Sequence, residues 1–115
     1  MKKIIITFLF SLVMSNTQEI VTFMSANPFS LKDIITDLEN QEEQTVTGIL
    51  TIPDKKDNAK YPLVLGIAGS SGWGEHHFEY LKMYQDMGIA TFQLQSFKSR
   101  GETSTVGTQN TVTIA

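Results

Sequence analysis

The sequence predicts an α/β fold, whose best-defined part is a strand-helix-strand unit between Tyr61 and Leu94. Residues 63–68 form an apolar run without a charge, as in strands that helices bury on both faces. Residues 89–94 form a second run of this kind. Two such strands joined by a helix of roughly 15 residues make the right-handed crossover unit of α/β sheets. The pattern therefore predicts a parallel sheet with residues 63–68 as a central strand.

The helix between these strands is predicted from its apolar spacing. Phe78, Leu81, Tyr84 and Met87, or Met83 in place of Met87, recur every three residues along one side. Gly88 stands where a helix takes its left-handed terminating residue.

Shorter elements are predicted on either side of this unit. Residues 19–25 and 45–52 are rich in β-branched and apolar residues and are expected to be strands. Between them, residues 31–38 have helical spacing, and Ser30 with Asp33 can form a capping box. Residues 54–60 are polar and are expected to be a surface loop, and residues 108–115 resemble the start of a further helix.

Composition sets the class of protein. The chain has 115 residues, of which 41% are hydrophobic and 18% charged, so it is expected to form one globular segment. Its formal charge is -3 and its nine basic residues are scattered, which argues against a nucleic acid partner.

The N-terminus has the layout of a secretory signal peptide. Lys2 and Lys3 precede ten residues without a charge, 4–13, and smaller, more polar residues follow. Ten residues are too few to cross a bilayer, which takes about 20, so a cleaved signal is favoured over a membrane anchor. An uncleaved anchor and a buried strand or helix remain as alternatives. We therefore expect residues 1–15 to be a signal and residues 16–115 to be the mature segment, with a net charge of -5 once both lysines are removed.

Cysteine is absent from the sequence. Disulfides, thiolate metal sites, a cysteine nucleophile and a lipid-attachment site are therefore excluded within these residues. Together with the signal, this predicts an exported protein, periplasmic or secreted, without a stable membrane anchor.

Glycines punctuate the turn between the first strand and the helix. The segment GIAGSSGWG places Gly66, Gly69, Gly72 and Gly74 where unpaired N–H groups and the positive end of the helix dipole favour an anion. The alternative is a tight connection that needs a positive φ and binds nothing.

Three kinds of ligand site can stand at a turn of this type. A P-loop is excluded because no Gly-Lys-Ser/Thr follows. A dinucleotide site would require G-x-G-x-x-G and an acidic residue after the next strand, where Gln93 and Gln95 stand, although Arg100 suits a 2′-phosphate. An oxyanion hole requires only backbone N–H groups aimed at developing negative charge.

Residues 61–105 resemble the dienelactone hydrolase-like branch of the α/β-hydrolase superfamily. The likeness is carried by LVLGIAGSSGWGEHH, by the helix end MGIAT and by QSFKSRG after the second strand. It implies a three-layer α/β-hydrolase-type sheet, of which this chain holds the N-terminal strands and the first crossover helix. The family often has His-Gly in the turn and an Asp opening the Ser-Phe segment, where this chain has Ala68-Gly69 and Gln95.

The resemblance implies a site without a cofactor or metal, acting on a small-molecule ester or lactone. The backbone N–H groups of Ser70 and Ser71 would form half of the oxyanion hole, and Trp73 and Arg100 would contact substrate. The family's nucleophile stands on a G-x-S-x-G type elbow, which these 115 residues lack, so the chain is expected to be an inactive N-terminal portion. A short exported anion-binding module and a nucleotide-binding βαβ unit remain as alternatives.

Each of these residues also has a purely structural interpretation. Trp73 can act as a lid over the first helical turn, and Arg100 can fix the following loop by bonding backbone carbonyls. His76 and His77 are neighbours on a helix and point about 100° apart, so surface packing is favoured over a cleft contact or a metal. Glu75 and Glu79 are expected to be solvated.

Overall fold

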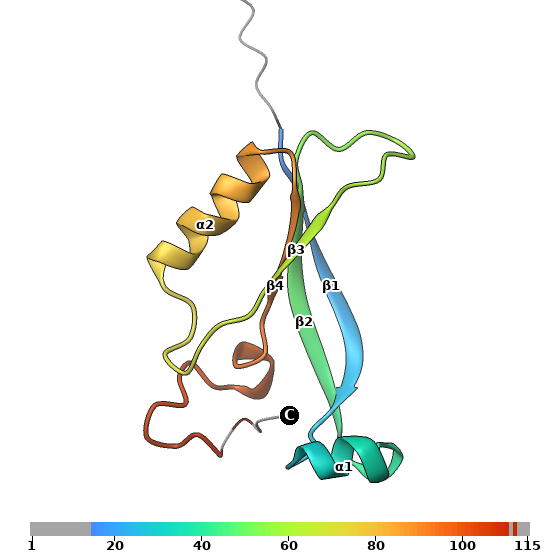
Figure 1. The fold of residues 1–115 in the computed structure, drawn as a ribbon, viewed down its shortest axis with the longest axis vertical. Coiled ribbons are helices and arrows are strands. Elements are labelled where there is room, and N and C mark those ends of the chain that lie inside the picture. The colour runs from blue at the N-terminus through green and yellow to red at the C-terminus, as the bar shows by residue number, and fades with distance from the viewer. Residues whose placement is uncertain (1–14, 111, 113–115) are drawn as a thin grey trace, which may run out of the picture.

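The computed structural model describes residues 15–110 and residue 112 (Figure 1). Residues 1–14 of the predicted signal and residues 111 and 113–115 of the predicted last helix lie outside the described residues. The described part contains four strands, two α-helices and two short 3-10 helices. In chain order they are β1 (Thr17–Ala26), α1 (Leu31–Thr36), η1 (Leu38–Asn40), β2 (Glu43–Ile52), β3 (Leu63–Gly66), α2 (Glu75–Asp86), β4 (Ala90–Leu94) and η2 (Lys98–Arg100).

The four strands form one mixed sheet in the order β1-β2-β4-β3. β2 is antiparallel to both β1 and β4, with Leu50 opposite Phe92. β3 and β4 are parallel, and α2 makes the crossover between them, as the sequence predicts. The fold is therefore broadly α/β, and its parallel part is confined to this one unit.

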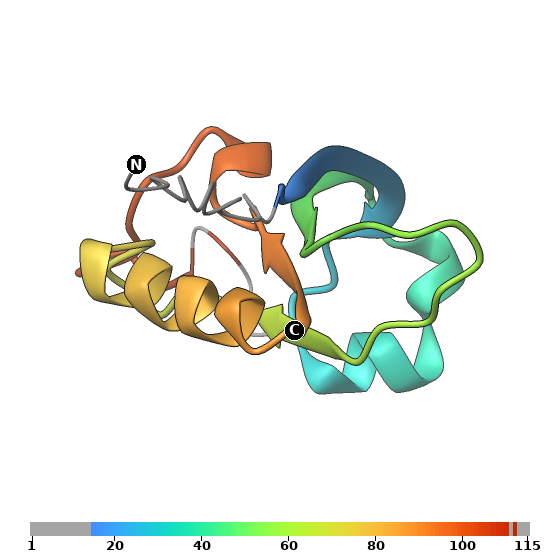
Figure 2. The same cartoon turned by 90° about the horizontal axis from the view of Figure 1, so that it is seen from above.

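The two faces of the sheet are covered differently. Leu81 of α2 packs over Gly66, and Gln85 of α2 donates a hydrogen bond of 2.8 Å to the Thr91 hydroxyl on β4. Leu63 and Leu65 lie on the opposite face, because side chains alternate along a strand. Figure 2 shows α2 alongside the sheet, with α1 away from it across the sheet.

The prediction that residues 63–68 form a central strand buried on both faces is wrong for the described part of the chain. β3 is the edge strand, and Leu63, Leu65 and Ile67 are 58%, 55% and 63% exposed. The cause is topological: β2 occupies the inner edge of β4, so the crossover from β3 places β3 outside. Within residues 15–110 and 112, β3 pairs with β4 alone, so its outer edge has no strand beside it.

Local signals at the helix ends are confirmed. Ser30 caps α1, since its hydroxyl accepts from the Asp33 N–H while the Asp33 carboxylate accepts from the Ser30 N–H at 2.8 Å. The helix ends at Thr36, so it is shorter than the predicted 31–38, and η1 follows it after one residue. Gly88, which follows the C-cap residue Met87 of α2, has φ of 80°, as its position predicts.

Two other expectations differ from the structure. In the predicted apolar stripe of α2, Leu81 is buried, whereas Phe78, Met83 and Met87 are exposed. Residues 108–110 are not helical, and residues 109 and 110 lie in a turn. Across residues 15–110 and 112, no helix is long and apolar enough to cross a membrane.

Candidate functional site

The turn after β3 is a compact glycine bend. The Gly72 N–H donates to the Gly69 carbonyl oxygen at 2.8 Å, and Gly72 has φ of 77°, which favours glycine. A β-carbon at position 72 would lie 2.3 Å from the carbonyl oxygen of Thr103. Glycine is therefore required at position 72 both by its backbone angle and by the close approach of the loop after β4.

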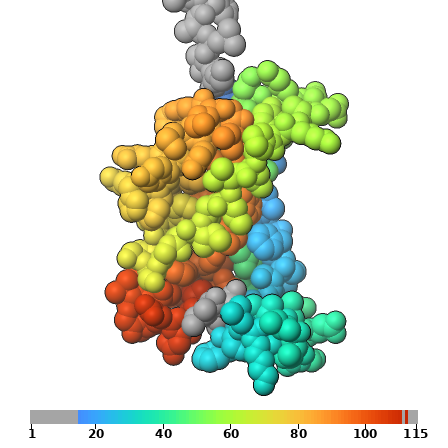
Figure 3. Space-filling model, viewed as in Figure 1, coloured from blue at the N-terminus to red at the C-terminus, as the bar shows by residue number. Residues whose placement is uncertain are grey.

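The loop after β4 holds this turn in place. The carbonyl oxygen of Ser70 accepts from the Thr105 N–H at 2.8 Å and from the Ser104 hydroxyl at 3.0 Å. Thr105 is buried at this junction. Figure 3 shows the loop, in red, against the yellow-green turn.

The backbone N–H groups of Ser70 and Ser71 take no part in these contacts. Within the described part of the chain, the N–H groups of Ser70 and Ser71 donate to no acceptor, and both residues are exposed. The two residues predicted to form half of an oxyanion hole thus present free donors at the carboxyl end of β3, ahead of α2.

Trp73 connects the turn to the sheet. Its indole Nε1–H donates to the Leu94 carbonyl oxygen at 3.1 Å. Its ring stacks on Phe78 with centroids 5.9 Å apart and meets His77 edge-on at 5.5 Å. These contacts fix the indole over the first turn of α2, the position that the lid interpretation gives it.

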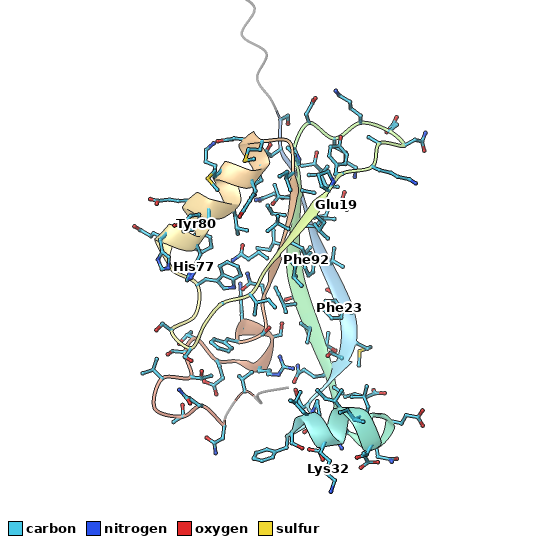
Figure 4. The ribbon with its side chains drawn as sticks, viewed as in Figure 1. Glu19, Phe23, Lys32, His77, Tyr80 and Phe92 are labelled. Atoms are coloured by element: carbon cyan, nitrogen blue, oxygen red, sulfur yellow. The ribbon has the colours of Figure 1, made fainter. Side chains whose placement is uncertain are left out.

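His77 has a structural role at the start of α2, where Figure 4 labels it. Its Nδ1 accepts from the Gly74 N–H at 2.9 Å, and its ring centroid lies 3.8 Å from that of His76. Among residues 15–110 and 112, no serine or threonine hydroxyl is hydrogen-bonded to either histidine. In the same residues, no group of three His, Cys, Asp or Glu side chains is placed to hold a metal ion.

A cleft of about 330 Å³ opens between the turn and the loop after β4. Trp73 and Phe97 supply its aromatic walls, while Lys98 and Glu102 bring opposite charges. Ser70, Ser71 and Arg100 are not among the lining residues, which are Ala68, Gly72, Trp73, Gln95, Ser96, Phe97, Lys98, Glu102 and Thr103. Phe97 was not predicted from the sequence as a residue of the site. Its place in the Ser-Phe segment directly after the second strand could have indicated it.

Arg100 has partners outside this cleft. Its Nε donates to Asn27 Oδ1 at 2.8 Å, and its Nη1 donates to the Ser96 carbonyl oxygen at 3.0 Å. Burial lowers the pKa of the guanidinium from its ordinary value. The side chain lines a groove with Phe23 and Leu94 on the face opposite α2. Arg100 therefore bonds a backbone carbonyl of its own loop, as the structural interpretation of this residue expects. Substrate binding by Arg100 stays a prediction.

The chain was compared with known protein families, curated proteins and solved structures. No family model, curated protein or solved structure matches the chain. The function is therefore inferred from the turn, the cleft and the residues that carry the family resemblance.

Proposed function

We propose that the chain is the N-terminal part of an exported hydrolase of the dienelactone hydrolase-like type, acting on a small-molecule ester or lactone. In this proposal the turn after β3 supplies half of the oxyanion hole. The observation that carries it is that, within the described residues, the N–H groups of Ser70 and Ser71 donate to no acceptor, in two exposed residues. The residues that resemble the family span this turn and the loop that holds it.

The fixed geometry of the turn supports such a role. Donors stabilise a developing oxyanion best when they are held in place before the reaction, because no reorganisation is then needed. Here the Ser70 carbonyl is held by Thr105 and Ser104, and the bend is closed by Gly69 and Gly72. Backbone donors in this arrangement bind negative charge whatever side chains residues 70 and 71 carry.

A complete site would require groups from outside these residues. Acyl transfer of this kind uses a nucleophile activated by a base, and the described residues show no hydroxyl bonded to His76 or His77. The outer edge of β3 is where a further parallel strand can pair, because β2 occupies the other side of β4. The exposed Leu63 and Leu65 support an additional strand and layer at this position.

The remaining parts of the proposal follow from the sequence. Residues 1–15 would direct export to the periplasm or outside the cell, and residues 16–115 would belong to the hydrolase domain. Acyl transfer through side chains and backbone donors uses no cofactor or metal. The acidic, unclustered charge of the chain supports a small-molecule substrate over nucleic acid.

The same free N–H groups support a second candidate, an exported module that binds a small anion without turning it over. Both candidates predict that the turn binds a carboxylate. They differ in whether a nucleophile is added beside β3.

An amide-resolved NMR titration of the chain with acetate tests the turn. Acetate should shift the Ser70 and Ser71 N–H resonances more than those of the exposed loop 54–60. Ser70→Pro removes one donor and should weaken binding severalfold, whereas Ser70→Ala keeps the donor and should not. Binding that leaves both resonances unmoved would exclude the turn as the anion site.

Reading the gene past codon 115 separates the two candidates. The hydrolase proposal expects a strand that ends in G-x-S-x-G or G-x-C-x-G about 30 residues further on. The product should hydrolyse p-nitrophenyl acetate, and Ser70→Pro should lower kcat by roughly 10²–10³ relative to Ser70→Ala. A stop codon at that point would favour the binding module.

A further inference from the structure

We propose that the cleft between Trp73 and Phe97 binds a small, flat aromatic group, so that the preferred ligand is a single-ring aromatic ester or acid. This inference rests on the proposed function, because the turn would hold the oxyanion or carboxylate while the cleft holds the ring. It assigns to Phe97 a role in specificity.

The size of the cleft limits the ligand. Its volume of about 330 Å³ is at the low end of the range for small-molecule sites, which is roughly 300–1,000 Å³. A single ring with a short substituent fits this space. Ala68 and Gly72 line the cleft, and they flank Ser70 and Ser71 in the sequence, so the cleft and the turn share residues.

The indole of Trp73 and the backbone of Phe97 are held before any ligand arrives. The indole of Trp73 is fixed by its bond to Leu94 O and by stacking on Phe78. The carbonyl oxygen of Phe97 accepts from the N–H groups of Arg100 and Glu102, each at 2.9 Å. A β-carbon at position 72 would lie 4.0 Å from Phe97 Cδ2, which places the phenyl ring close to the turn. Walls that are already ordered lose little entropy when a ring binds.

The charges at the cleft favour no sign of ligand charge. Lys98 and Glu102 both line it, one cationic and one anionic. The cleft itself therefore selects for apolar, flat shape, and aromatic rings stack favourably on other aromatic rings. Selection for negative charge falls to the turn.

Three probes separate the ring from the charge: benzoate, acetate and benzyl alcohol. Trp73 is the only tryptophan in the chain, so its indole N–H gives one NMR resonance that reports on the cleft. Benzoate should bind about tenfold more tightly than acetate, since it adds ring burial to the carboxylate contact. Benzoate and benzyl alcohol should both shift the indole resonance, and acetate should shift only the Ser70 and Ser71 amides.

The test variant is Phe97→Ala, and the matched control is Phe29→Ala. Phe29 is 70% exposed and stands just before α1. Phe97→Ala should weaken benzoate binding about 2- to 10-fold, the range of an aromatic pair, and leave acetate binding unchanged. Phe29→Ala should change neither. The indole shift with benzyl alcohol is measured on the unaltered chain, so the inference is tested even if Phe97→Ala fails to fold.

The outcomes distinguish this inference from the proposed function. Equal affinity for benzoate and acetate, with an unmoved indole, overturns the aromatic cleft and leaves the anion site. A shifted indole with silent Ser70 and Ser71 amides supports the cleft and overturns the proposed function. No response to any probe overturns both.

Discussion

The two faces of the sheet at β3 and β4 show what one covering helix achieves. On the α2 face, Leu81 is 8% exposed and Thr91 only 1%. On the opposite face and edge, Leu63 and Leu65 stay more than half exposed although they lie on a strand of the same unit. A parallel strand needs a layer on each side, and here one side has it. Within residues 15–110 and 112, α2 therefore buries the face of β4 that it covers, while the side chains of β3 on the other face stay exposed.

Figure 4 illustrates the contrast along the open face, where Phe92 lies on β4 and Phe23 on β1. The ring of Phe92 lies over Gly48, whose β-carbon would be 2.1 Å from the ring. That contact is within the sheet itself. At Phe92, therefore, the open face packs a side chain onto a neighbouring strand of the same sheet.

The largest expected effect is on the covered face. Leu81→Ala should lower the free energy of unfolding by about 2–4 kcal/mol, because it removes a buried side chain and leaves a cavity against the sheet. Leu65→Ala is the matched control on the open face and should cost less than about 1 kcal/mol. Urea unfolding followed by circular dichroism measures both. Equal losses would contradict the contrast between the two faces.

A second prediction concerns the glycine bend above the covered face. Gly72→Ala should destabilise the fold by about 2–3 kcal/mol, since alanine tolerates φ of 77° poorly and its β-carbon meets Thr103 O. Gly101→Ala is the control: φ there is 75°, but no other group lies within 4 Å of the added carbon. It should cost only about 1–2 kcal/mol. A thermal unfolding series on both variants separates the contact from the backbone angle.

A third change sharpens the role of Arg100 on the open face. Arg100→Met should cost about 1–2 kcal/mol through the lost hydrogen bonds to Asn27 and Ser96, discounted for the partial exposure of the side chain. Asn27→Ala and the double variant complete a cycle in chemical denaturation. Additive losses would show that the Arg100–Asn27 bond adds nothing, and would leave the guanidinium free for a substrate carboxylate.

The smallest effect on stability is expected at the open edge, where association should change instead. Leu65→Lys should alter the unfolding free energy by less than about 0.5 kcal/mol. It should nevertheless reduce self-association, because charge on an edge strand opposes strand pairing between molecules. Light scattering after size exclusion measures this. Ile35→Lys on α1, where Ile35 is 81% exposed, is the control and should leave association unchanged. An unaltered chain that is monomeric at high concentration would contradict the open edge as an association site.

Signals that act over a few residues could be interpreted from the sequence. The Ser30 and Asp33 capping box, the positive φ of Gly88 and the crossover from β3 through α2 to β4 all lie within one short segment each. Their geometry is dictated by backbone sterics and by donors and acceptors that are near in the chain, so the pattern of residue types is enough to predict them. The glycine turn and its free N–H groups belong to the same class.

The tertiary structure alone decided four other features. They are the position of β3 at the edge, the approach of Thr103 and Thr105 to the turn, the hydrogen bond from Arg100 to Asn27 and the aromatic cleft at Phe97. Arg100 and Asn27, for example, are separated by 73 positions. An apolar run has the same composition whether its neighbours cover one face or two, and a phenylalanine after a strand shows no partner in the sequence. Which residues meet depends on strand order, and strand order depends on the burial balance of the whole sheet rather than on any one segment.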